Sequence, residues 1–500
     1  MNKKRALRNV FSSLLSYGAL LILSIVVSKY IIVGYGSETN GLLASVNQIF
    51  SYISLLEAGI GTATIRALYT PLGTKNDEEI NDILASSKFY YRRSAIWYFA
   101  CVVIVSIIWP FVIETSISYW TVFCLIFFHG IAGVITFCYT QTIVNYLVAT
   151  GKNYINNNVH VLATLASSAL KLLICMFGLN IVSVSISLVL VNILKCLVYR
   201  RHMRKLCPEF FSNRNTGKNA LPQRNSFLVH EISGVIFYST DTIIISVFCG
   251  LNEASVYAVY SLVVTSLRMI IGQVFNGTKY ILGSAYSNDK QKYYTTHDWY
   301  NTIYICCVFI IYTVAFILLR PFVTLYTNGI TDADYLAPYL PVLFILIELL
   351  SSCRITDNEL IRVSLHASKT ISRTVTEAAI NLLFSLILVQ YIGLYGVLIG
   401  TIVALLYRTN DIVLYVNHRI LGRSAVYEYK LYCSNFLMFT LFACASRKYM
   451  ISADNYFQLV MLALVVSLIT AVAFISFNIA LSPQIRELIK TKRRLHGISE

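Results

Sequence analysis

Apolar runs of about 20 residues recur from one end of this 500-residue chain to the other. A helix of that length crosses the hydrocarbon core of a bilayer, and the runs lack the alternation that barrel strands show. Lipid offers backbone groups no hydrogen-bonding partner, so each run must satisfy its own backbone as a helix. Only 13% of the residues are charged, against about 25% in soluble domains. The sequence therefore predicts an all-α polytopic membrane protein.

Fourteen membrane-spanning helices fit the pattern of apolar runs. Most of the 40 lysines and arginines fall on one side of these spans, whereas Arg320, Arg447 and Lys448 fall on the other. The positive-inside rule then predicts that both termini are cytoplasmic. The first run lacks a small-residue cleavage site, so we expect it to be retained as a helix. The predicted spans are 7–33, 41–65, 94–113, 119–149, 156–177, 182–199, 226–248, 254–276, 300–319, 336–364, 370–390, 394–416, 431–446 and 457–480.

The composition and motifs exclude several functions. The net charge of +16 is spread over loops that flank the membrane, which disfavours nucleic-acid binding. The 12 cysteines and 8 histidines show no metal-ligand spacing. No phosphate-binding loop, HExxH or GxSxG motif occurs in a suitable context. We therefore expect no resident metal or cofactor and no enzymatic activity.

The two halves of the chain resemble each other. Residues 36–41 after the first span are similar to 250–255 after the seventh, and three further matches follow in order, at offsets of about 212 to 218 residues. Six helices per repeat give both halves the same orientation, so the pseudo-two-fold axis is expected along the membrane normal. This architecture favours a transporter. The predicted domains are an N-lobe at 1–199, a basic cytoplasmic linker at 200–224, a C-lobe at 225–418, and two further spans with a basic tail at 419–500.

Charged residues inside the spans are costly, so each requires a reason. One interpretation is mutual pairing and snorkelling at span ends, and the other is a wet, functional cavity. Lys29 and Lys195 lie near span ends, and Arg408 and Asp411 can pair on one helix face. We single out ten such residues, five of each sign: Lys29, Lys171, Lys195, Arg268, Arg408, Glu57, Glu231, Asp241, Glu348 and Asp411.

The seventh and tenth spans carry the clearest polar patterns. Glu231, Gly234, Tyr238 and Asp241 follow 3-4-3 spacing and form one stripe on a helix. The stripe is either a packed polar seam or a cavity wall that binds a proton or a cation. The inner half of the tenth span carries Arg354, Asp357, Glu359 and Arg362. These charges predict that it projects into the cytosol or lines a water-filled vestibule.

Two segments resemble a known family. The segments "YGSETNGLLASVNQIFSYISLLEAGIGTATIRALYTPL" at 35–72 and "STDTIIISVFCGLNEASVYAVYSLV" at 239–263 are similar to the polysaccharide-biosynthesis flippases, the O-antigen and capsule exporters of the MATE-like MOP superfamily. The resemblance implies alternating-access translocation of a polyprenyl-pyrophosphate-linked oligosaccharide across a bacterial inner membrane, alongside a polymerase and glycosyltransferases. It implies a cationic cavity, for which Lys29, Lys171, Arg268 and Arg408 are available.

Drug-exporting relatives in this superfamily couple transport to H⁺ or Na⁺ through acidic residues. The residues here on the corresponding helices are Glu231 or Asp241, and Glu348, with Tyr238 on the same stripe. Lipid II flippases carry several arginines in their first two spans, whereas this chain has Lys29 and Arg66 there, which disfavours that substrate.

Two other functions are consistent with this pattern. One is a MATE-type exporter of small molecules coupled to H⁺ or Na⁺. The other is a membrane enzyme or assembly partner, such as a polymerase or ligase. Long outer loops would favour the enzyme, and the longest here runs only from about Arg320 to Tyr335.

Overall fold

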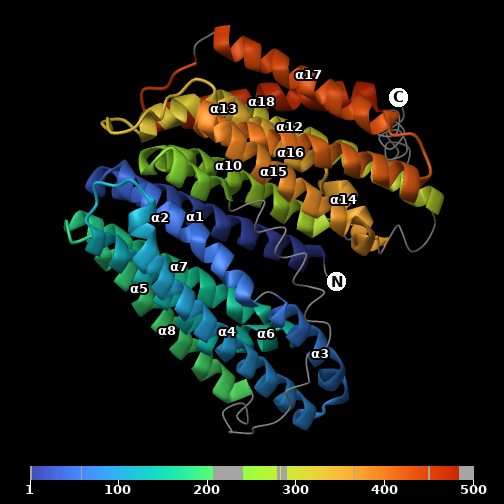
Figure 1. Cartoon of the computed structure of the whole chain (residues 1–500). Helices are drawn as coiled ribbons and strands as arrows, with labels where there is room; N and C mark the ends of the chain where they lie inside the picture. The colour runs from blue at the N-terminus through green and yellow to red at the C-terminus, as the bar shows by residue number, and fades with distance from the viewer. Residues whose placement is uncertain are drawn as a thin grey trace. The chain divides into compact units, whose positions relative to one another are not determined.

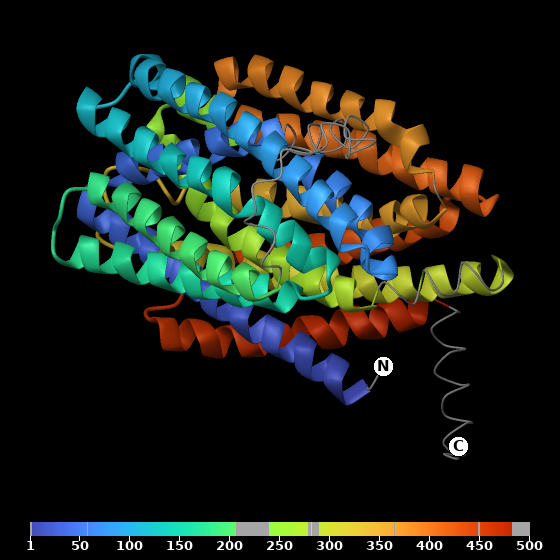
Figure 2. The same ribbon diagram turned by 90° about the horizontal axis from the view of Figure 1, so that it is seen from below.

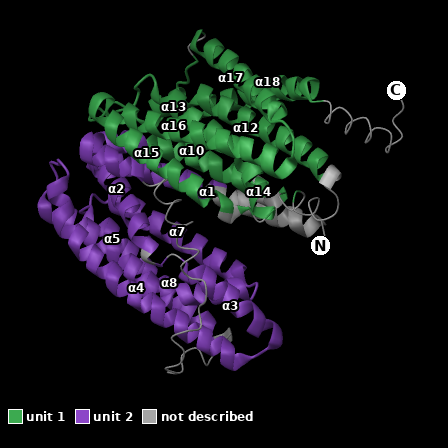
Figure 3. Ribbon diagram, turned by 45° about the vertical axis from the view of Figure 1, so that its right-hand side comes forward, with its two compact units in different colours: residues 1–15, 259–500 green, residues 16–258 purple. Residues whose placement is uncertain are grey.

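The computed structural model describes residues 3–57, 59–206, 240–278, 282, 290–364, 366–448 and 451–482, and every regular element within these ranges is a helix (Figure 1). The chain divides into two compact units, residues 16–258 and residues 1–15 together with 259–500 (Figure 3). Within each unit the helices run side by side as a bundle (Figure 2). The predicted linker falls largely outside the described residues, so the predicted lobe boundaries stay a prediction.

The first part of the chain folds into long helices separated by short turns. A helical stretch at 240–248 follows the last of them. The elements are α1 (Lys3–Tyr35), α2 (Ser37–Ile53), the 3-10 helix η1 (Ser54–Glu57), α3 (Ile60–Thr74), α4 (Asp77–Val112), α5 (Tyr119–Tyr139), α6 (Gln141–Ala149), α7 (Asn153–Met176) and α8 (Val182–Leu206).

The second part continues the same design. The elements are α10 (Leu251–Thr278), α12 (Lys290–Tyr326), α13 (Leu340–Cys353), α14 (Ile355–Val363), the 3-10 helix η3 (Ala367–Thr370), α15 (Ile371–Ile392), α16 (Leu394–Tyr415), the π-helix η4 (Val416–Leu421), α17 (Val426–Lys448) and α18 (Tyr456–Leu481).

The exposed surface of the described helices is strongly apolar, as a lipid environment requires. Nine of these helices are long and apolar enough to cross a membrane. Large side chains that a soluble protein would bury lie more than half exposed, among them Trp97, Trp120, Tyr391 and Phe457. The prediction of a polytopic all-α membrane protein is confirmed.

Three predicted spans are wrong as single helices. Residues 41–65 form α2, η1 and α3, and Gly59, which precedes α3, takes a φ of 81° that lies outside the helical range. Residues 119–149 break at Thr140, whose hydroxyl and backbone N–H both donate to the carbonyl of Thr136, at 2.8 and 2.9 Å. Residues 336–364 break at Arg354, between α13 and α14.

The breaks at Thr140 and Arg354 occupy equivalent places in the proposed repeat. They lie about 214 residues apart, which is within the range of offsets found in the sequence. A helix break at membrane depth exposes backbone groups, and it is tolerated only where protein or a wet cavity satisfies them. Both breaks therefore mark positions where polar side chains are expected to gather.

Helices α15 and α16 make the most extensive helix pair among the described residues. Gly396 and Gly400, four residues apart on α16, lie against the backbone of Leu388 and Ser385 on α15. A Cβ atom at Gly400 would lie 2.6 Å from the backbone nitrogen of Ser385. This is the small-residue packing by which membrane helices approach closely.

We expect Gly396→Ala and Gly400→Ala to push α15 and α16 apart, because each added methyl group meets backbone rather than a movable side chain. Overpacking of this kind costs about 1 to 3 kcal/mol of unfolding free energy. The measurement is the thermal unfolding midpoint of the purified protein in detergent. Gly272→Ala on α10 is the matched control, since a Cβ atom there meets nothing within 4 Å. Equal midpoints for all three variants would contradict the close contact.

Candidate functional site

The predicted stripe on the seventh span is only partly described. Glu231, Gly234 and Tyr238 lie outside the described residues, so their predicted roles stay predictions. Asp241 lies on the helical stretch 240–248 and is 5% exposed.

Asp241 belongs to a seam of hydroxyl groups in the unit 16–258. The hydroxyl of Tyr257 on α10 donates to Asp241 Oδ2 at 3.3 Å. One residue earlier, Thr240 shares a hydrogen bond with Tyr52 on α2. The seam continues with Ser45 against Ser246 and with Asn40 donating to Ser255 at 2.8 Å. These contacts join α2, the stretch 240–248 and α10.

Arg268 and Glu348 form one ion pair. Arg268 on α10 donates through Nε to Glu348 Oε2 at 2.8 Å and through Nη2 to Oε1. Tyr312 on α12 donates to the same carboxylate at 2.9 Å. The Glu348 side chain is 1% exposed, whereas that of Arg268 is 32% exposed. The sequence assigned these two residues to different roles, and the structure places them in one bidentate contact.

A second network lies at the break between α13 and α14. The predicted pair of Arg408 and Asp411 forms, with Nη1 to Oδ2 at 2.6 Å. Arg408 Nε also lies 3.4 Å from Glu377 Oε2. Arg354, at the helix break, donates to the other oxygen of Glu377, and Arg373 donates to the other oxygen of Asp411. Three arginines and two carboxylates therefore alternate from the break before α14 to α15 and α16.

Arg373 and Glu377 were not predicted as part of a site, although both lie within the predicted span 370–390. Their spacing of four residues on an apolar helix is the signal that could have found them. The inner half of the tenth span was predicted to project into the cytosol or line a water-filled vestibule. In the structure Arg354 and Asp357 are buried, at 7% and 0% exposure, whereas the side chain of Arg362 is 71% exposed.

The lysines of the unit 16–258 are in different surroundings. Lys171 lies half-buried on α7, close enough to His129 on α5 to interact electrostatically. Among the described residues, Lys171 makes no hydrogen bond or ion pair. Lys195 on α8 and Lys29 on α1 are also half-buried. Glu57 is hydrogen-bonded by Gln141 Nε2 at 3.1 and 3.2 Å, beside the break at Thr140.

Among the described residues, one group of side chains is placed to share a metal ion. It consists of His297 on α12, Asp357 on α14 and Glu428 on α17. Sequence spacing could not indicate this group, because its members are far apart along the chain.

Known structures share this fold, although neither a protein-family model nor a curated protein matches the sequence. The lipid II flippase MurJ, in an inward closed conformation, superposes with a TM-score of 0.69 at 12% identity, over 95% of this chain and 99% of that one. An inward-facing multidrug resistance MATE transporter of the MOP superfamily gives 0.63 at 17% identity, over 79% and 94%. A MOP superfamily transporter from Pyrococcus furiosus gives 0.55 at 15% identity, over 84% and 97%.

The chain therefore has the fold of the MOP superfamily transporters. The predicted MATE-like architecture is confirmed, and with it the resemblance at the level of the fold. The O-antigen and capsule substrates stay a prediction.

The buried network gives a test of which charges hold the unit 1–15 and 259–500 together. Arg408→Ala should lower the free energy of unfolding by about 1.5 to 3 kcal/mol, because it removes the charged contacts to one oxygen each of Glu377 and Asp411, whose other oxygens keep Arg354 and Arg373. Arg373→Ala should cost about 1 kcal/mol or less, because that side chain is 38% exposed. Thermal unfolding in detergent measures both, and equal losses would refute the distinction.

For Asp241 we expect a structural role. Asp241→Asn keeps an oxygen that accepts from Tyr257, so abundance and transport should stay close to wild type. Asp241→Ala removes the acceptor from a buried seam and should lower membrane abundance. Quantitative blots and transport rates check both variants. Normal abundance with lost transport in Asp241→Asn would instead assign a charge-coupling role to the carboxylate.

Proposed function

We propose that this protein is a flippase that moves a polyprenyl-pyrophosphate-linked oligosaccharide from the cytoplasmic to the outer leaflet by alternating access. The single observation that carries the proposal is the environment of Lys171. This residue is a cation within an apolar helix that has no carboxylate partner among the described residues, inside a fold shared with MOP superfamily transporters.

The contrast between Lys171 and the arginines is informative. Arg268 and Arg408 are each matched by buried carboxylates. A charge at membrane depth is expensive without a counter-ion, and functional groups are the usual exception. A pyrophosphate headgroup would supply the missing anion, and charge-assisted hydrogen bonds to phosphate are strong. Lys171 is therefore the residue that we assign to the substrate phosphate.

The other predicted cations take secondary roles in this proposal. The guanidinium of Arg408 is 5% exposed and held by two carboxylates, so we assign it to structure rather than to substrate. Arg268 is partly exposed despite its pair with Glu348, so it remains a candidate phosphate contact. Lys29 remains a candidate on α1.

The physical need for such a protein is clear. A headgroup with a pyrophosphate and several sugars cannot cross hydrocarbon unaided, because desolvating its charges is too costly. A transporter that encloses the headgroup and leaves the polyprenyl tail in lipid removes that barrier. We place the protein in a bacterial cytoplasmic membrane with both termini inside. Its proposed partners are glycosyltransferases that supply the substrate and a polymerase that uses it, with H⁺ or Na⁺ as the coupling ion.

The second candidate is a MATE-type exporter of small molecules coupled to H⁺ or Na⁺. The buried carboxylate of Glu348 favours it, since a proton or a cation could compete there with Arg268. The two functions differ in substrate, so a transport assay separates them.

The test uses proteoliposomes that contain a fluorescent polyprenyl-pyrophosphate oligosaccharide and follows its protection from a quencher outside the vesicle. Lys171→Ala should slow flipping about tenfold to a hundredfold, because a charged hydrogen bond contributes about 1.5 to 3 kcal/mol and 1.4 kcal/mol is a factor of ten. Lys171→Arg should retain most of the activity. A wild-type rate in Lys171→Ala would remove this residue from the proposal.

Lys195→Ala is the matched control, because it removes the same charge from a half-buried helix position in the same unit. We expect its rate to lie within about twofold of wild type, since Lys195 reaches the membrane surface by snorkelling. If a pH or Na⁺ gradient drives uptake of cationic dyes and the glycolipid does not move, the protein is the small-molecule exporter and not the flippase.

A further inference from the structure

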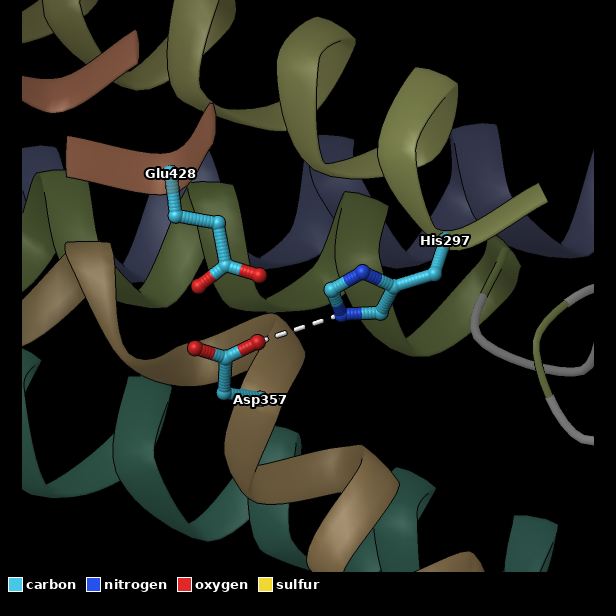
Figure 4. Close-up of side chains that lie close together, drawn as sticks. All are labelled: His297, Asp357 and Glu428. Atoms are coloured by element: carbon cyan, nitrogen blue, oxygen red, sulfur yellow. Dashed lines mark hydrogen bonds and ion pairs between the residues drawn. The ribbon is translucent and has the colours of Figure 1, made fainter. Parts of the chain in front are cut away.

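His297, Asp357 and Glu428 meet where α12, α14 and α17 approach one another (Figure 4). Each side chain is 0 to 1% exposed. One possible ligand atom from each lies within 4.8 Å of the others. In Figure 4 the two carboxylates and the imidazole point toward one another.

The cluster leaves buried polar atoms unsatisfied. His297 Nε2 and Asp357 Oδ1 are 3.1 Å apart and share a hydrogen bond. Three further atoms, His297 Nδ1, Asp357 Oδ2 and Glu428 Oε2, have no hydrogen-bond partner within the described part of the chain. The nearest carboxylate oxygen of Asp298 lies 3.7 Å from His297 Nδ1, beyond hydrogen-bond distance. Buried polar atoms are nearly always satisfied, so three in one place require an explanation.

The cluster contains more carboxylates than its neighbouring arginine can pair with. Asp298 is neutralised by Arg423, which donates to both of its oxygens at 2.7 and 2.8 Å. Arg423 also reaches Glu428 at 3.4 Å, but its two close hydrogen bonds are to Asp298. The carboxylates of Asp357 and Glu428 therefore lie together at 0% exposure, with no second arginine or lysine paired to them among the described residues.

We propose that His297, Asp357 and Glu428 bind one divalent transition-metal cation that joins α12, α14 and α17. An imidazole nitrogen with two carboxylate oxygens is a ligand set that Zn²⁺ and Mn²⁺ accept. The two positive charges of the ion would neutralise the carboxylates of Asp357 and Glu428, and a metal-bound imidazole is neutral. The unsatisfied oxygens of both carboxylates become ligands, which removes the cost of burying them.

The proposed ion has a structural task. Glu428 lies at the start of α17, the first of the two helices that follow the second repeat. His297 lies on α12 and Asp357 on α14, and both are close to this first turn of α17. The ion would therefore fasten α17 to α12 and α14 at one end. This inference is independent of the proposed flippase function, because it concerns residues that the transport proposal does not use.

The test is made on the full-length protein purified in detergent. Elemental analysis should find about one Zn²⁺ or Mn²⁺ per chain after purification. Removal of the ion with EDTA should lower the thermal unfolding midpoint, and addition of Zn²⁺ or Mn²⁺ should restore it by at least about 2 °C, because an ion that binds the folded state stabilises it. Mg²⁺ and Ca²⁺, which prefer all-oxygen sites, should restore less.

Substitutions within the cluster and beside it test whether these three residues bind the ion. Glu428→Gln and His297→Ala should lose both the bound ion and the response of the midpoint to added ion. Glu359→Gln is the matched control, because Glu359 lies on α14 two residues after Asp357 and pairs instead with Arg362. It should keep both properties. The wild-type measurements do not depend on whether any variant folds.

Two results would overturn the proposal. The first is a wild-type protein that holds no stoichiometric ion and whose midpoint none of the four ions shifts. The second is an ion response that persists undiminished in Glu428→Gln. If the protein holds no ion and Glu428→Gln is as stable as wild type, shared protons rather than a metal neutralise the two carboxylates.

Discussion

The structure depends on the inability of lipid to solvate charge. In the unit 1–15 and 259–500, most of the buried charge meets an opposite charge on another helix. Arg268 pairs with Glu348, which is 80 residues away in the sequence, and Arg408 pairs with both Glu377 and Asp411. Such pairs contribute little net stability, because desolvation offsets most of the attraction. They fix which helices lie together, since a mismatched arrangement would leave a charge alone in an apolar interior.

Much of the fold could be predicted from the sequence because lipid imposes a simple rule on length and polarity. The helical spans follow from that rule. The breaks at Thr140 and Arg354 could not be predicted, because neither proline nor glycine marks them. A local side-chain bond at Thr140 and a distant carboxylate at Arg354 accompany them instead. The periodicity of apolar residues does not predict either of these contacts.

The candidate sites were harder to predict than the spans, because most of their contacts join residues that are far apart in the sequence. The pair of Arg408 and Asp411 was predictable because its members are three residues apart on one helix. The partnership of Arg268 with Glu348 depends on which helices pack together, which hydropathy does not specify. Lys171 is one of the charged residues that the sequence places inside a span, and the structure adds that no carboxylate among the described residues pairs with it. That contrast separates a candidate substrate contact from the charges that serve packing.

The network around Arg408 also bears on how the chain enters the membrane. Helices α15 and α16 form a tight hairpin, joined at Gly393 with a φ of 56°. Their charged members in the network are Arg373 and Glu377 on one arm and Arg408 and Asp411 on the other, so each arm is neutral. During synthesis the two arms can leave the translocation machinery together with their charges already compensated. The hairpin can thus act as one unit of insertion, and Arg354, at the break before α14, meets Glu377 in the folded bundle.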